Sequence, residues 1–135
     1  MARSLTAYLK RSDVPERAAL QQAIDALKFK ATLDADYAPF ETSGYLPCTL
    51  DGEDAGFDLR FRNVAADLPP TVQAGLSGRD VALALKWSGD PREEMAALVF
   101  CAALVGNFDA VVQEGDADGF LSTEQLIAKA EAAQE

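Results

Sequence analysis

The sequence predicts an α+β fold, in which a mainly antiparallel sheet of about four to five strands packs against two or three helices. Three observations support this prediction. Residues 57–61 and 81–87 alternate between large apolar residues and small or polar ones, as strands do. Residues 14–28 and 91–105 carry apolar residues at helical spacing behind clear helix-start signals. Short polar turns such as Asp51-Gly52 separate the runs, which favours hairpins.

The composition indicates an acidic protein with one domain spanning residues 1–135. Its formal net charge of −10 repels nucleic-acid phosphates and anionic lipid, so we expect neither nucleic acid nor membrane as a partner. The same charge favours encounter with basic proteins. The N-terminus has no apolar segment typical of a signal peptide, and no apolar run is long enough to span a bilayer. We therefore expect a cytoplasmic protein with its two cysteines reduced.

The first third of the chain is expected to form two helices and a strand. Residues 4–11 are compatible with a short helix. Asp13 followed by Glu16 has the spacing of a capping box, which predicts a longer helix from Val14 to about Lys28. The alternating residues 29–34 predict the strand that follows.

The middle of the chain predicts a hairpin. Residues 44–50 form its first strand, in which Pro47 indicates an edge position or a bulge. Asp51-Gly52-Glu53-Asp54 is a polar turn, and 57–61 is the second strand with Phe57, Leu59 and Phe61 directed inward. The proline- and glycine-containing stretch 63–78 is expected to be a loop with a short helical turn around 70–75.

Residues 81–112 form the most regular part of the sequence, with a strand, a helix and a strand in succession. Asp90 and Pro91 are a strong helix start, and 91–105 is apolar around most of its circumference. Such a helix is normally covered on two sides, so we expect it to lie across the sheet beside the first or last helix. A strand at 110–113 follows.

The segment 114–125, EGDADGFLSTEQ, partly matches a calcium-binding EF-hand loop. Asp116, Asp118 and Ser122 fit three ligand positions, but Glu114 and Gln125 replace the residues preferred at the first and last positions. The polar turn into a final helix, capped by Ser122 and Gln125, is therefore the favoured interpretation, and no metal is expected.

No residue pattern indicates catalysis. The chain has no histidine, which excludes Ser-His-Asp and Cys-His nucleophile systems and most zinc sites. We expect a protein that is not an enzyme and has no cofactor. Lys86 and Trp87 at a strand end are compatible with a ligand spot, although a tryptophan that caps the core is the favoured alternative.

Acidic residues interleaved with aromatic ones predict a partner-binding surface in the loops around residues 34–56. Aromatics among charges of one sign are a common interface composition. The nearby aromatics are Tyr37, Phe40, Tyr45 and Phe57. For each of them, an interface role and a core role are equally compatible with the sequence. The predicted binding residues are Asp34, Asp36, Tyr37, Glu41, Asp51, Glu53 and Asp54.

The segments 44–61 and 79–130 resemble small acidic bacterial proteins of uncharacterised function, some of which are similar to immunity proteins of interbacterial toxin systems. The resemblance implies a non-catalytic domain that occludes a basic toxin, as a monomer or a homodimer. A homodimeric chaperone similar to those of type III secretion is an alternative, with helix 91–105 as its dimer face. A small enzyme or calcium module is a weaker alternative.

Overall fold

The computed structural model describes residues 4–27, 29–33, 37–41, 43–64, 68, 70–88, 90–115 and 119–134. Its main sheet has five strands, all paired antiparallel, and confirms the predicted fold class. In spatial order these strands are β3 (Ser43–Leu46), β6 (Phe57–Asn63), β7 (Val81–Lys86), β1 (Ser4–Leu9) and β8 (Val111–Glu114). A second sheet of three strands consists of β2 (Ala31–Leu33), β4 (Cys48–Leu50) and β5 (Glu53–Asp54).

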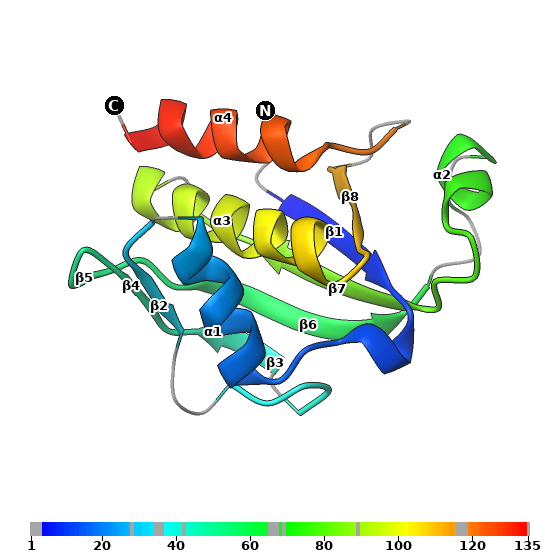
Figure 1. Cartoon of the computed structure of the whole chain (residues 1–135), viewed down its shortest axis with the longest axis horizontal. Coiled ribbons are helices and arrows are strands. Elements are labelled where there is room, and N and C mark those ends of the chain that lie inside the picture. The colour runs from blue at the N-terminus through cyan, green and yellow to red at the C-terminus, as the bar shows by residue number, and fades with distance from the viewer. Residues whose placement is uncertain are drawn as a thin grey trace.

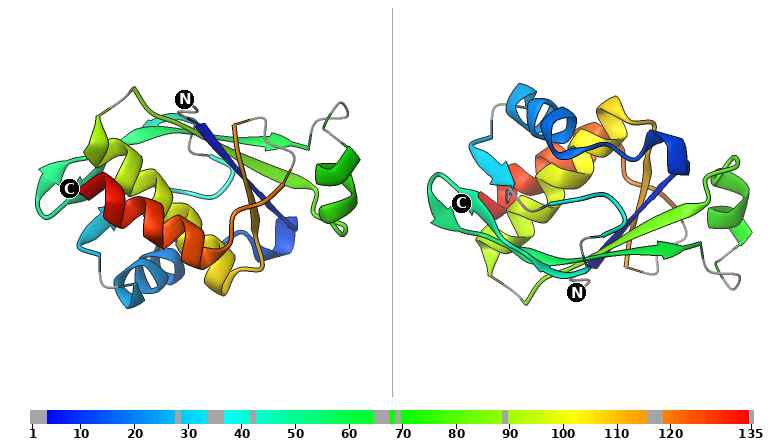
Figure 2. Two further views of the ribbon diagram at one scale, coloured as in Figure 1. Left: turned by 90° about the horizontal axis from the view of Figure 1, so that it is seen from above. Right: turned by 90° about the horizontal axis from the view of Figure 1, so that it is seen from below.

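Three helices cover one face of the five-stranded sheet, and a short helix packs at one end of the other face (Figures 1 and 2). The covering helices are α1 (Arg17–Ala26), α3 (Pro91–Asn107) and α4 (Thr123–Gln134). The short helix α2 (Pro70–Gly75) lies where a helical turn was predicted, and its Val72 packs against Tyr8 and Ala82 of the sheet. In the part of the chain described by the structure, no helix has the length and apolar character needed to cross a bilayer.

The N-terminal segment is a strand, so the prediction of a short helix at 4–11 was wrong. β1 lies between β7 and β8 and pairs with both of them. Leu5, Ala7 and Leu9 alternate along it and are fully buried on the helix-covered face. Backbone pairing on both sides, together with this burial, outweighs a weak local helix preference. β7 and β8, which precede and follow α3, are consequently not neighbours.

Pro47 divides the predicted strand 44–50 between the two sheets. β3 pairs with β6 in the large sheet, whereas β4 pairs with β2 and β5 in the small one. Because proline has no N–H to donate to a ladder, it suits the point where the chain leaves one sheet for the other. The turn between β4 and β5 has Asp51 at φ 54° and Gly52 at φ 83°, as expected for a two-residue hairpin turn.

α3 is the centre of the core. Every residue from Met95 to Leu104 is buried, between the sheet behind it and α1 and α4 on its flanks (Figure 1). Its start is as predicted: Pro91 is at the first helical position, and the Asp90 carboxylate accepts a 2.8 Å hydrogen bond from the Arg92 backbone N–H. The expectation of cover on two sides is confirmed, by both of the candidate helices.

The two flanking helices differ in how well their starts were predicted. α4 begins as expected, because Ser122 and Gln125 exchange hydrogen bonds of 2.8 and 3.1 Å in a capping box. α1 begins at Arg17 rather than Val14, with Glu16 as an N-cap whose side chain makes no capping bond. The predicted Asp13–Glu16 capping box is therefore wrong, since Asp13 belongs to a preceding 3-10 helix, Arg11–Asp13.

Candidate functional site

The predicted acidic turn is the exposed tip of the β4–β5 hairpin. Asp51, Glu53 and Asp54 are all exposed there. Glu53 forms a 3.2 Å ion pair with Arg92, in the first turn of α3, and both side chains are more than half exposed. The hairpin tip and the start of α3 therefore lie together at one end of the molecule, as Figure 1 also shows.

Asp90, which the sequence predicted only as a helix cap, adds a carboxylate to this region. A hollow of about 350 Å³ separates the hairpin from α3 and is lined by Leu50, Asp51, Glu53, Asp90, Pro91, Arg92, Met95 and Ala133. Its lining combines apolar residues with three acidic residues and one arginine. We call Asp51, Glu53, Asp54 and Asp90 the acidic end. Spatial proximity of residues about 40 positions apart leaves no signal in a single sequence.

Tyr37 and Glu41, the other predicted binding residues that the structure describes, do not join this surface. Tyr37 is a core residue, 4% exposed, whose ring lies 6.3 Å from that of Phe100 and whose hydroxyl donates a hydrogen bond to the Pro15 carbonyl. Glu41 is exposed, but it follows Phe40, which packs against Phe61 toward the far end of β6. Asp34 and Asp36 lie outside the described residues.

Of the four aromatics for which a core role and an interface role were equally compatible, two are core residues and two are exposed. Tyr37 and Phe57 are buried, whereas Phe40 is 38% and Tyr45 61% exposed. Tyr45 lies on a second hollow of about 260 Å³ that also includes Lys86, Trp87 and Glu93. Its ring covers Gly56 so closely that a Cβ at that position would collide with it. Trp87 is partly buried and packs against the core, consistent with the favoured interpretation.

Three polar side chains of the segment 114–125 that the structure describes bond within the protein. Ser122 and Gln125 are the capping pair of α4, and Glu114 forms a 3.4 Å ion pair with Lys129. Asp116 and Asp118 lie outside the described residues. Within the described ranges, no group of three or more His, Cys, Asp or Glu side chains is arranged to hold a metal ion.

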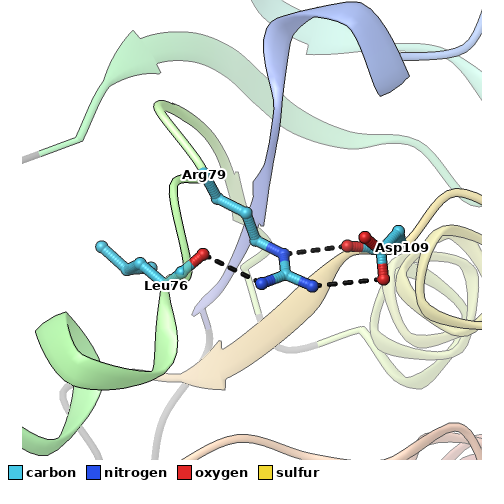
Figure 3. Close-up of polar contacts among 3 residues, drawn as sticks. All are labelled: Leu76, Arg79 and Asp109. Carbon is cyan, nitrogen blue, oxygen red and sulfur yellow. Dashed lines mark hydrogen bonds and ion pairs between the residues drawn. The ribbon is translucent and has the colours of Figure 1, made fainter.

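Arg79 has a structural role, because its guanidinium makes three hydrogen bonds to Leu76 and Asp109 (Figure 3). Its guanidinium donates to the Asp109 carbonyl at 2.9 Å, to the Asp109 carboxylate at 3.3 Å and to the Leu76 carbonyl at 2.9 Å. The side chain is only 11% exposed. It joins the loop after α2 to the loop before β8, and its donors are directed at these partners rather than at solvent.

The burial of the Cys101 thiol and the Tyr37 hydroxyl predicts how the free energy of unfolding depends on pH. Burial raises the pKa of the Cys101 thiol above its ordinary 9.0 and that of the Tyr37 hydroxyl above its ordinary 10.0. Above pH 9 the unfolded chain therefore loses protons that the folded chain keeps, so the free energy of unfolding falls as pH rises. Each group contributes up to about 1.4 kcal/mol per pH unit.

Thermal unfolding of the reduced protein between pH 8 and 10.5 measures this effect. The variant Cys101→Ala should lose less stability over the same range than the wild type. If the stability of the two proteins fell equally with pH, the attribution of this pH dependence to Cys101 would be contradicted. Cys48 and Cys101 are both buried and are not joined in a disulfide, and their burial makes them inaccessible as nucleophiles.

Comparisons of the chain with protein-family models, curated proteins and solved structures found no match.

Proposed function

We propose that this chain is a non-catalytic protein-binding domain, an immunity protein that binds and occludes a cognate bacterial toxin in the cytoplasm. The observation that carries the proposal is the acidic end. Exposed carboxylates from the β4–β5 hairpin and from the start of α3 surround one hollow. A basic protein surface is the partner that this charge arrangement favours.

Occlusion would be both steric and electrostatic. Toxins that act on nucleic acids or nucleotides need basic active sites for their own substrates, and such a site is complementary to the acidic end. Charge complementarity mainly accelerates association, whereas a few well-packed anchors hold the complex together. Tyr45, the most exposed large apolar residue described, lines a neighbouring hollow with Trp87 and Glu93 and suits the role of anchor.

A secretion chaperone that dimerises through α3 fits the structure less well. That alternative requires an exposed face on the helix, and Met95 to Leu104 are all buried beneath α1, α4 and the sheet. We therefore prefer one chain bound to one toxin molecule.

The experiment that tests the function is co-expression with the product of the neighbouring gene. Expressed alone, that product should arrest growth, and co-expression of this protein should restore it. The purified pair should elute as a 1:1 complex. A neighbouring product that is harmless, or one whose toxicity persists although both proteins are present, would contradict the proposal.

Reversing two charges at the hairpin tip should weaken the complex. Glu53→Lys with Asp54→Lys is expected to raise the Kd roughly 100-fold, at about tenfold for each reversed contact, mostly through a slower association rate. Asp51 is left unchanged because its φ of 54° favours Asp or Asn over lysine.

The matched control is Glu16→Lys with Glu124→Lys. It changes the net charge equally, at exposed positions at the starts of α1 and α4. Calorimetry should find its affinity within about threefold of the wild type, since long-range charge effects are screened beyond about 8 Å at physiological salt. Equal weakening by the two double variants would mean that net charge, and not the acidic end, determines binding.

A further inference from the structure

A third hollow is formed where α3 and α4 meet the ends of β7 and β8. It has a volume of about 390 Å³, and its lining includes Trp87, Glu94, Leu98, Glu114, Lys129 and Ala133. The first half of α3 and the second half of α4 lie side by side in this region (Figure 1). The volume falls within the range of small-molecule sites.

The strand register places the two sheet residues of this hollow on the face that the helices cover. Glu114 is opposite Leu5, and Leu5 is opposite Leu85. Opposite residues on adjacent strands point to the same face, and both leucines are buried in the main core. Trp87 follows Leu85 by two positions and packs against the same core. Trp87 and Glu114 therefore both lie on the side of the helices.

The helix residues of the hollow agree with this placement. Glu94 and Leu98 are one turn apart on α3, so they share a helix face, and Leu98 is buried. Lys129 and Ala133 share a face of α4 in the same way. The Lys129 ammonium lies 3.4 Å from the Glu114 carboxylate, and this ion pair joins α4 to β8 at the hollow.

The hollow combines an aromatic ring with an excess of negative charge. The only tryptophan of the chain lines it together with two carboxylates and one ammonium. Lys129 offsets the charge of Glu114, which leaves that of Glu94. Glu94 is partly buried, and its carboxylate has no ion pair among the described residues. Tryptophan is the side chain whose ring attracts cations most strongly.

We propose that this hollow binds a small organic cation that carries an ammonium group on an apolar body. The Glu94 carboxylate accepts charge-assisted hydrogen bonds from the ammonium, and the Trp87 ring adds a cation–π contact. The apolar body displaces water from Leu98 and Ala133. This inference goes beyond the proposed binding of a toxin, because no residue of the acidic end lines this hollow.

Tryptophan fluorescence of the purified protein tests this site directly, because Trp87 is the single tryptophan of the chain. Phenethylammonium chloride, added at constant ionic strength, should change the emission in a saturable way. Phenethyl alcohol has a hydroxyl in place of the ammonium and should bind about tenfold more weakly. Hydrocinnamate, an anion with a similar body, should bind more weakly still. The absence of a saturable change with the cation, or equal affinity for the alcohol or the anion, would overturn the proposal.

Two variants test the roles of the carboxylate and the ring. Glu94→Gln should weaken binding of phenethylammonium about tenfold, because a charge-assisted contact is lost, and should leave the affinity for the alcohol unchanged. Trp87→Phe should weaken binding of the cation roughly threefold, as measured by calorimetry because the fluorophore is removed. Wild-type affinity of both variants for the cation would contradict the proposed contacts.

The matched control is Glu131→Gln. It removes an equal charge from an exposed position two residues after Lys129 on α4, and residues two apart on a helix do not face the same way. The affinity for phenethylammonium should stay unchanged. Weakening equal to that of Glu94→Gln would show diffuse attraction by the net charge instead of a site. No measurement in this series includes the toxin, so its failure and the failure of the proposed function are separate outcomes.

Discussion

Replacing Phe100 with alanine is expected to lower the free energy of unfolding by about 3–5 kcal/mol. Phe100 is 1% exposed and lies at the middle of α3, where three elements meet. Its ring makes edge contacts with Phe57 at 5.5 Å and with Tyr37 at 6.3 Å. Alanine would leave a cavity between α3 and the sheet that its rigid neighbours cannot fill, and the lost ring contacts add to that cost.

Denaturant unfolding of the wild type and Phe100→Ala measures the difference. Phe40→Ala is the matched control, because it removes the same side chain from a position that is 38% exposed. We expect it to cost less than about 1 kcal/mol, in line with partly exposed surface sites. A similar loss for both variants would mean that the core is not centred on α3.

Replacing Arg79 with methionine is expected to cost about 2–4 kcal/mol. The change keeps much of the apolar stem but removes three hydrogen bonds from a side chain that is 11% exposed. The carbonyls of Leu76 and Asp109 then lose their guanidinium partner, and an unsatisfied polar group that remains shielded from water costs about 1–3 kcal/mol. Arg79→Lys should recover less than half of the loss, since one ammonium group cannot reproduce the planar fork.

Asp109→Asn separates hydrogen bonding from charge at this site. Asparagine also tolerates the φ of 59° found at this position, and its side-chain oxygen still accepts from the guanidinium. We expect a cost below about 1 kcal/mol, because the Asp109 side chain is 70% exposed and its ion pair is therefore weak. Thermal unfolding of the three variants provides the comparison. A larger loss for Asp109→Asn than for Arg79→Met would contradict this account.

Most elements with a local signal were predicted well, although the Asp13–Glu16 capping box was not. The Asp90-Pro91 start of α3 and the Ser122–Gln125 cap of α4 depend on hydrogen bonds within one turn of helix, so they are visible in consecutive residues. The alternation of large apolar residues with small or polar ones in 57–61 and 81–87 likewise indicates which side of each strand is buried. The error at residues 4–11 is of another kind. β1 is a strand because β7 and β8 lie on both sides of it, and neither neighbour is close in sequence.

The candidate surfaces show the same division. The sequence by itself determined the acidic charge, the lack of histidine chemistry, the Asp51-Gly52 turn and the apolar character of α3, since these depend on composition or on a few adjacent residues. Only the tertiary structure decided that Tyr37 is in the core and that Asp90 joins the hairpin carboxylates. Their proximity results from strand pairing and helix packing between distant segments, and those contacts leave no periodic pattern in a single chain.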